Sequence, residues 1–198
     1  DFLIDETHLE FELFEDRTVV SSRLLMKRNP DSGNVNAPLI LNGQELELLS
    51  LSLDGEALDN NAYDIDSETL RVHMVPDSFV LENKVLIKPQ KNTSLEGLYK
   101  SKKMFCTQCE AEGFRNITYY LDRPDVLSKF TTRIEADKSS YPVLLSNGNC
   151  NESGVSANDP ERHWATWEDP FKKPCYLFAL VAGNLHFIND TFRSCSGR

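Results

Sequence analysis

Leu9-Glu10-Phe11-Glu12-Leu13 is the stretch that decides the predicted fold, because large apolar side chains alternate in it with glutamates. In a β-strand, two-residue alternation places one set of side chains on each face, so that one face is buried and the other solvated. The polar residues 15–17 end this run, and the apolar segment 18–20 follows them. This order predicts a β-hairpin with one face in the core.

The same kind of pattern recurs along the chain at intervals of roughly ten residues, which is typical of all-β domains. Leu49, Leu51 and Leu53 alternate ahead of Asp54-Gly55, a pair that favours a tight hairpin turn. Another hairpin is predicted at Glu82-Asn83-Lys84, between the apolar segments 79–81 and 85–87. Further strands are expected at residues 70–74, 130–136, 143–145, 163–167, 176–182 and 185–192, and a polar surface loop at 150–161.

Helical periodicity is scarce. One helical turn is predicted at residues 124–127, with Asp122 as its N-cap. We therefore predict an all-β fold, a multi-sheet β-sandwich with short hairpins and very little helix. Because the sequence shows no internal repeat and no linker, residues 1–198 are expected to form one domain.

Composition excludes several classes of partner. The 198 residues carry a net charge of −10, which disfavours nucleic-acid binding because a phosphate backbone would be repelled. No apolar run approaches the about 20 residues that cross a bilayer, so no membrane association is expected.

The cysteines and sequons bear on the compartment. The five cysteines are odd in number and irregularly spaced, and no signal peptide is visible, so reduced thiols and a cytoplasmic location are predicted. The sequons at Asn92, Asn116, Asn151 and Asn189 are accordingly expected to stay unglycosylated.

The usual catalytic motifs are absent from the sequence. The four histidines are far apart and none belongs to a His-Glu-x-x-His motif, so no metal site is predicted in this chain. There is no Gly-x-Ser-x-Gly elbow and no phosphate-binding loop. Cys106-Thr107-Gln108-Cys109 is a lone C-x-x-C motif, which is interpreted as structural. No catalytic residue is therefore expected in this chain.

One polar segment stands out, Thr107-Gln108-Cys109-Glu110-Ala111-Glu112-Gly113-Phe114-Arg115. If it is extended, the side chains of Gln108, Glu110 and Glu112 share one face. A carboxylate beside an amide carbonyl can accept hydrogen bonds from a free α-ammonium group, which is mostly charged at neutral pH. From these residues alone, either an ammonium site or a solvated acidic strand remains open.

The segment has a counterpart in a known family. Together with residues 117–126 it resembles the N-terminal domain of M1-type zinc metallopeptidases of the aminopeptidase N type. Other resembling stretches lie at residues 39–43, 95–99, 141–149, 167–171 and 173–183. The resemblance spans almost the whole chain, in the order that the family has.

The resemblance implies an enzyme that removes N-terminal amino acids from peptides with a free N-terminus. It implies that this chain is a saddle-like, non-catalytic β domain, which covers its own catalytic domain and lends residues to the substrate pocket. Gln108 and Glu110 match the pocket residues of the family, where the glutamate holds the substrate's amino group. Zinc belongs to the full-length enzyme, and its binding motif is missing from these residues, so the chain by itself is expected to be inactive and free of metal.

Two other interpretations remain. A non-catalytic member of the same superfamily would use this domain for protein assembly. An autonomous binding module could stack Tyr119, Tyr120, Trp164 and Trp167 on sugars, although aromatic residues that alternate along a strand more often belong to the core.

Overall fold

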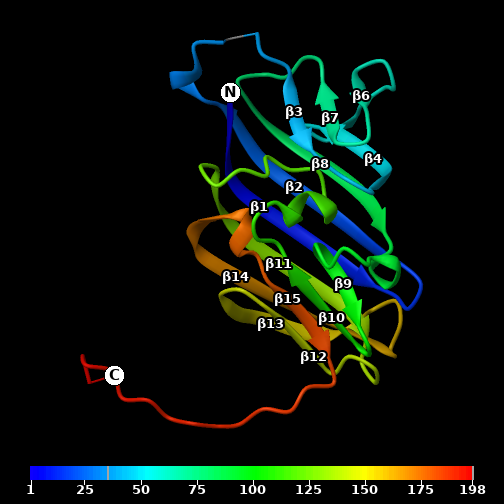
Figure 1. Ribbon diagram of the computed structural model, residues 1–198, viewed down its shortest axis with the longest axis vertical. Helices are drawn as coiled ribbons and strands as arrows, with labels where there is room; N and C mark the ends of the chain where they lie inside the picture. The colour runs from blue at the N-terminus through cyan, green and yellow to red at the C-terminus, as the bar shows by residue number, and fades with distance from the viewer. Residues whose placement is uncertain (35, 198) are drawn as a thin grey trace.

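The computed structural model describes residues 1–34 and 36–197, and within them it is built from strands (Figure 1). Four short 3-10 turns are the helical elements of this part of the chain: η1 (Pro30–Ser32), η2 (Pro89–Lys91), η3 (Gly113–Asn116) and η4 (Cys175–Leu177). The strands are β1 (Phe2–Leu13), β2 (Thr18–Arg28), β3 (Leu39–Asn42), β4 (Glu47–Leu53), β5 (Glu56–Ala57), β6 (Tyr63–Ile65), β7 (Thr69–Val72), β8 (Ser78–Ile87), β9 (Gly97–Ser101), β10 (Met104–Gln108), β11 (Leu127–Asp137), β12 (Val143–Ser146), β13 (Asn149–Val155), β14 (Arg162–Pro174) and β15 (Leu180–Gly183).

An eight-stranded sheet, in the order β13-β14-β11-β1-β2-β8-β4-β5, forms the frame of the domain. β1 and β11 run parallel, and the other paired strands of this sheet run antiparallel. The hairpin predicted around Leu9 to Val20 is confirmed as β1 and β2, which lie near the middle of the sheet.

The alternation seen in the sequence becomes a buried row across this sheet. Phe11 pairs with Val20 on one side and with Ile134 on the other, and all three side chains are fully buried. Val85 and Ala165 extend the row on the next strands. Since burying each large apolar side chain contributes about 1.5–3 kcal/mol, such rows fix the register of the sheet.

Two smaller sheets lie over the buried face (Figure 1). The three-stranded sheet β3-β7-β6 covers one end and the four-stranded sheet β12-β15-β10-β9 covers the other. Aromatic rings join the layers: Phe178, which follows η4, stacks on Phe11 of the large sheet at 5.9 Å between ring centroids. The buried side chains of the three sheets form one core, so the predicted all-β, multi-sheet domain is confirmed.

A buried connecting segment, residues 117–122, runs between the layers. The Thr118 hydroxyl donates to Oδ1 of Asn83 at 2.8 Å, and the Tyr120 hydroxyl bonds Oγ1 of Thr7 at 2.9 Å. Tyr120 also exchanges two backbone hydrogen bonds with Asn42 at the end of β3. This segment therefore ties the three-stranded sheet to the large one.

The hairpin predicted at Glu82-Asn83-Lys84 is wrong, because β8 runs through it without a break. Asn83 points inward, where its amide donates to Oγ of Ser22 at 2.7 Å. Glu82 and Lys84 point outward on the charged face. A polar residue that finds hydrogen bonds in the core looks like a turn residue in the sequence.

Three other expectations need correction. The predicted loop 150–161 begins with β13, whose side chains are largely exposed but whose backbone pairs with β14. Of the expected strand at 176–182 only the last part is a strand, β15. Residues 185–192 pair with no strand in the described structure.

The predicted helical turn at 124–127 is also wrong. Residues 123–126 form a single turn, closed by the hydrogen bond from Val126 N to the carbonyl of Arg123. The Asp122 carboxylate does not cap it, because it is directed inward to Arg115.

Among the described residues, no helix has the length and the apolar character that crossing a membrane requires.

We expect Asn83→Ala to lower the free energy of unfolding of this chain by about 1–3 kcal/mol, because it removes two buried hydrogen bonds. Urea unfolding measures the change. Ser52→Ala is the matched control, since the Ser52 hydroxyl bonds Glu82 on the outer face, and a change within about 0.5 kcal/mol is expected there. Equal effects of the two substitutions would contradict the role assigned to the buried amide.

Candidate functional site

The candidate site is the turn that follows β10. Gln108 is the last residue of that strand and pairs with Gly97 of β9. The chain then turns back, and Gly113 N donates to the carbonyl of Cys109 at 2.9 Å before η3 begins. Cys109 and Phe114 are buried on either side of the turn, and residues 110–112 between them are exposed.

The structure brings Gln108 and Glu110 together, both exposed. Nε2 of Gln108 donates to the backbone carbonyl of Glu110 at 3.2 Å. This bond fixes the amide, so its Oε1 remains available as an acceptor. The peptide bond between Glu110 and Ala111 is cis.

The extended conformation considered for residues 107–115 is not the one that the structure shows. The strand ends at Gln108, so Glu110 and Glu112 do not continue its face. The physical reason is burial, because Cys109, Gly113 and Phe114 enter the core and draw the chain back.

The two glutamates of this turn differ in their partners. Oε2 of Glu112 lies 3.1 Å from the Arg115 guanidinium and forms an ion pair with it. Among the described residues, the carboxylate of Glu110 has neither a hydrogen-bond donor nor an ion-pair partner. Glu110 is thus the acceptor in this turn that is free for a ligand.

A buried ion pair supports the turn from beneath. Oδ2 of Asp122 accepts from Nε of Arg115 at 3.0 Å and from the Arg115 backbone N–H at 3.1 Å. Asp122 is only 3% exposed. Arg115 therefore links this carboxylate to Glu112, and it ties the turn to the buried segment 117–122. This pair was not predicted from the sequence, where its signal is an arginine and an aspartate on either side of the mostly apolar run 117–121.

Two buried thiols complete the support. Sγ of Cys175 donates to Oδ1 of Asp122 at 3.1 Å. Burial raises the pKa of both the Cys109 and the Cys175 thiol, and the negative charge of Asp122 raises each further. Because a thiol must be deprotonated to attack or to bind a metal, Cys109 is not poised for redox chemistry in the C-x-x-C motif.

The close approach within the turn requires a glycine at position 113. A Cβ added there would lie 2.4 Å from the carbonyl oxygen of Gln108 and 2.9 Å from the backbone N of Gly97. Both contacts are with backbone atoms, which cannot move aside as a flexible side chain can.

The aromatic residues considered for sugar binding do not form a platform. Tyr119 and Tyr120 are buried in the core, at 2% and 0% exposure. Nε1 of Trp167 donates to the carbonyl of Leu144, and the Arg133 guanidinium lies over the Trp164 ring at 4.2 Å.

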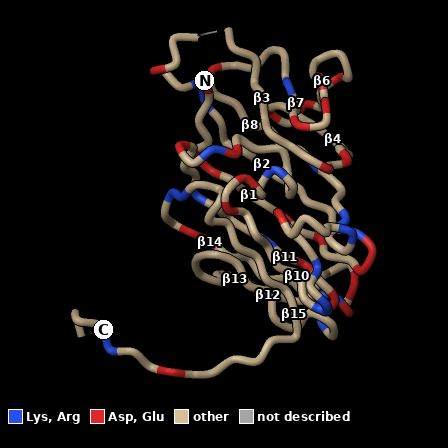
Figure 2. Tube along the Cα trace, viewed as in Figure 1, with Lys and Arg blue, Asp and Glu red and all other residues tan. Residues whose placement is uncertain are grey.

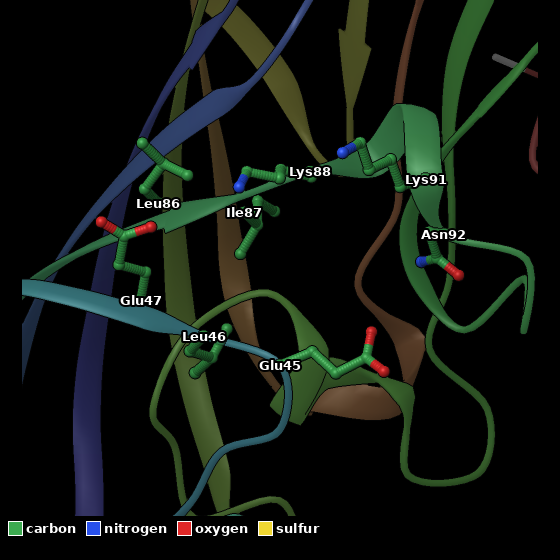
Figure 3. A pocket seen from close by; sticks show the side chains of 8 residues that line it. All are labelled: Glu45, Leu46, Glu47, Leu86, Ile87, Lys88, Lys91 and Asn92. Atoms are coloured by element: carbon green, nitrogen blue, oxygen red, sulfur yellow. The ribbon is translucent and has the colours of Figure 1, made fainter.

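A surface pocket of about 350 Å³ lies elsewhere, between the start of β4 and the turn η2 (Figure 3). Two glutamates face two lysines across it, and the Asn92 amide is occupied with its own turn, donating to the carbonyl of Glu96 at 2.7 Å. The lining residues are Glu45, Leu46, Glu47, Leu86, Ile87, Lys88, Lys91 and Asn92. This balanced set gives the pocket no preferred charge of ligand.

The sequence matches the family described as the Peptidase M1 N-terminal domain over residues 7–177. The chain belongs to this family. It is 52% identical over 197 residues to aminopeptidase N of Caulobacter vibrioides and 49% identical over 198 residues to aminopeptidase N of Escherichia coli. All of this chain is covered in both comparisons, yet it spans only 22% of the length of each relative.

Solved structures show the same fold. Legionella pneumophila aminopeptidase A, determined in complex with aspartic acid, superposes with a TM-score of 0.94 at 33% identity, over 100% of this chain and 23% of that one. An M1 zinc metallopeptidase from Deinococcus radiodurans shares the fold with a TM-score of 0.75 at 14% identity, over 92% of this chain and 42% of that one.

The described residues of this M1 domain form no cluster of side chains that could bind the zinc named for the Deinococcus relative. No three of their His, Cys, Asp or Glu side chains gather as metal ligands. The described residues therefore do not fit a zinc site, and no chemical step is assigned to zinc on this domain.

We expect Gly113→Ala to destabilise the M1 domain by about 1–3 kcal/mol, because the added methyl group meets backbone on both sides. Urea unfolding reports the loss. Gly183→Ala is the matched control, since its Cβ would meet the flexible Met104 side chain at 3.1 Å, and a smaller effect is expected. A Gly113 variant as stable as the parent would show that the turn adjusts freely.

Proposed function

We propose that this chain is the non-catalytic N-terminal domain of a zinc-dependent aminopeptidase, and that its Glu110 binds the free α-amino group of the substrate peptide. The observation that carries the proposal is the contrast within one turn. Glu112 is paired with Arg115, whereas the exposed carboxylate of Glu110 has no partner among the described residues.

The chemistry of the turn suits an ammonium ion. A charged amine donates up to three hydrogen bonds, and each bond to a carboxylate contributes about 1.5–3 kcal/mol. The Glu110 carboxylate and Oε1 of Gln108 are acceptors on the same turn, held together by the bond from Gln108 to the Glu110 carbonyl. No lysine or arginine pairs with Glu110 within the described residues to compete for it.

In this proposal Glu110 acts by positioning. When the ammonium is fixed, the first peptide bond lies at a set distance from the reacting centre, and bonds further along the peptide do not reach it. Such an arrangement favours cleavage of the first peptide bond, which is exopeptidase activity. Zinc would polarise the carbonyl and activate water in the whole enzyme, and its ligands would come from outside the described residues.

The proposal includes a partner within the same protein. The whole chain matches aminopeptidase N relatives but covers only 22% of their length. We therefore propose that it caps its own catalytic domain and completes the substrate pocket there. A cytoplasmic enzyme is proposed, in keeping with five free cysteines.

Glu110→Gln, introduced into the full-length enzyme, tests the assignment. The substitution keeps the size of the side chain and removes its charge, so kcat/KM for peptides with a free amine is expected to fall roughly 10- to 150-fold. Glu112→Gln is the control, since Glu112 is an exposed partner of Arg115, and little change is expected.

A second substrate separates amine binding from general damage. For a peptide whose α-amino group is replaced by hydrogen, kcat/KM should be the same in the Glu110→Gln variant as in the unsubstituted enzyme. An unchanged kcat/KM for free-amine peptides would remove Glu110 from the site. An enzyme that shows no aminopeptidase activity with Glu110 intact would instead support the assembly role.

A further inference from the structure

Arg115 is held in place by its main chain as well as by its side chain. Its backbone N–H and its Nε both donate to Oδ2 of Asp122, at 3.1 and 3.0 Å. Its carbonyl accepts from the backbone N of Gln44 at 2.9 Å, which attaches it to the chain that follows β3. The guanidinium is therefore a fixed point at the base of the candidate turn, and its side chain is only 15% exposed.

The guanidinium bonds two carboxylates that differ in burial. Nε is bonded to Asp122, whose side chain is 1% exposed, and Nη2 lies 3.1 Å from Oε2 of Glu112, whose side chain is 68% exposed. A buried carboxylate that loses its partner destabilises the fold strongly, whereas an exposed one is solvated by water. Arg115 is thus fixed by Asp122, and Glu112 is the member of the group that is held by the other two.

Glu110 and Glu112 occupy the same short turn. Two residues of chain span at most about 7 Å, so both carboxylates lie within reach of one ligand. An ammonium group donates three hydrogen bonds and would bind to either carboxylate if both were free. Binding at Glu112 would displace the first peptide bond from the position that Glu110 gives it, and a displacement of about 1 Å reduces a rate by up to about a hundredfold. A single position for the amine therefore requires that one of the two carboxylates be withdrawn.

An ion pair is not the general condition of an acidic residue in this chain. Acidic residues outnumber basic ones by 31 to 21, and Figure 2 shows acidic residues at both ends of the domain. The carboxylates therefore cannot each have a basic partner of their own. Within the candidate turn, Glu112 has such a partner, and Glu110 has none among the described residues. This distribution gives the two glutamates different roles.

We propose that Arg115 is a positioning residue of the amine-binding site. It holds Glu112 aside in an ion pair, so that the α-ammonium group of the peptide binds to Glu110 in a single position. This inference rests on the proposed function, because it requires that Glu110 binds the amine. It adds that the effect of Glu112 on the reaction depends on Arg115. Glu112 has no effect while it is paired, and it competes for the ammonium group when it is released.

Arg115→Lys, introduced into the full-length enzyme, releases Glu112. Lysine keeps a positive charge beside Asp122, but its single ammonium nitrogen lacks the fork with which a guanidinium bonds two groups at once. Peptides with a free amine should then also bind at Glu112, where they are not cleaved. We expect kcat and KM to fall together, each by about two- to fivefold, because two exposed carboxylates of similar strength share the ligand. kcat/KM should stay within about twofold of its value in the unsubstituted enzyme, since it reports only the productive complex.

Two further variants separate this effect from structural damage. Arg115→Lys combined with Glu112→Gln removes the competing carboxylate, so kcat and KM should return to the values of the unsubstituted enzyme. Glu112→Asp keeps a carboxylate but shortens the side chain by one methylene, about 1.5 Å, which withdraws it from Arg115 and leaves the buried pair intact. It should lower kcat and KM together, whereas Glu112→Gln alone changes neither. Because Glu112 is exposed, its variants decide the question even where Arg115→Lys does not fold.

Two results would overturn the inference. One is that Arg115→Lys and Glu112→Asp both keep the kcat and KM of the unsubstituted enzyme. The other is a fall in kcat/KM of Arg115→Lys that Glu112→Gln does not reverse, which would show that Arg115 only stabilises the fold. A peptide whose α-amino group is replaced by hydrogen is the control, and its kinetics should be the same in every variant that folds.

The outcomes also separate this inference from the role of Glu110. Impaired kinetics of Glu110→Gln, together with unchanged kinetics of Arg115→Lys and Glu112→Asp, would keep the amine-binding role and remove the positioning role. Unchanged kinetics of Glu110→Gln would remove both, because no ammonium group would then be bound at this carboxylate.

Discussion

The structure depends on one constraint: the buried side chains of Thr118, Tyr120 and Asp122, in segment 117–122, need hydrogen-bond partners inside the protein. An unpaired polar group in the core costs about 1–3 kcal/mol, so the segment is held to the position where its bonds are made. Thr118 bonds the large sheet through Asn83, and Tyr120 bonds it through Thr7 while pairing with the three-stranded sheet. Asp122 ends the segment at Arg115. The large sheet, the three-stranded sheet and the turn at Arg115 are thereby joined by one short piece of chain.

The conformation of the candidate site depends on this constraint. Arg115 is fixed by the buried carboxylate of Asp122, and it also engages Glu112. One glutamate of the turn is ion-paired with Arg115, and Glu110 is exposed without a partner among the described residues. Burial raises the pKa of the Cys109 and Cys175 thiols, so they support the turn without offering a nucleophile, and Cys175 donates a hydrogen bond to Asp122.

The distribution of charge divides the surface into two kinds. The sequence carries a net charge of −10, and charged side chains lie on the outer face of the large sheet, whereas the central residues on the outer face of the four-stranded sheet are uncharged.

The sequence by itself determined the all-β class, the central hairpin and the family, because two-residue alternation and long matched stretches are properties of neighbouring residues. It also selected Gln108 and Glu110 as candidate residues. Only the tertiary structure decided that Asn83 lies within a strand, that residues 107–115 turn instead of extending, and that Glu112 is paired while Glu110 is free. These outcomes depend on partners distant in sequence, such as Ser22 for Asn83 and Asp122 for Arg115, and no local pattern specifies which polar side chain will meet such a partner.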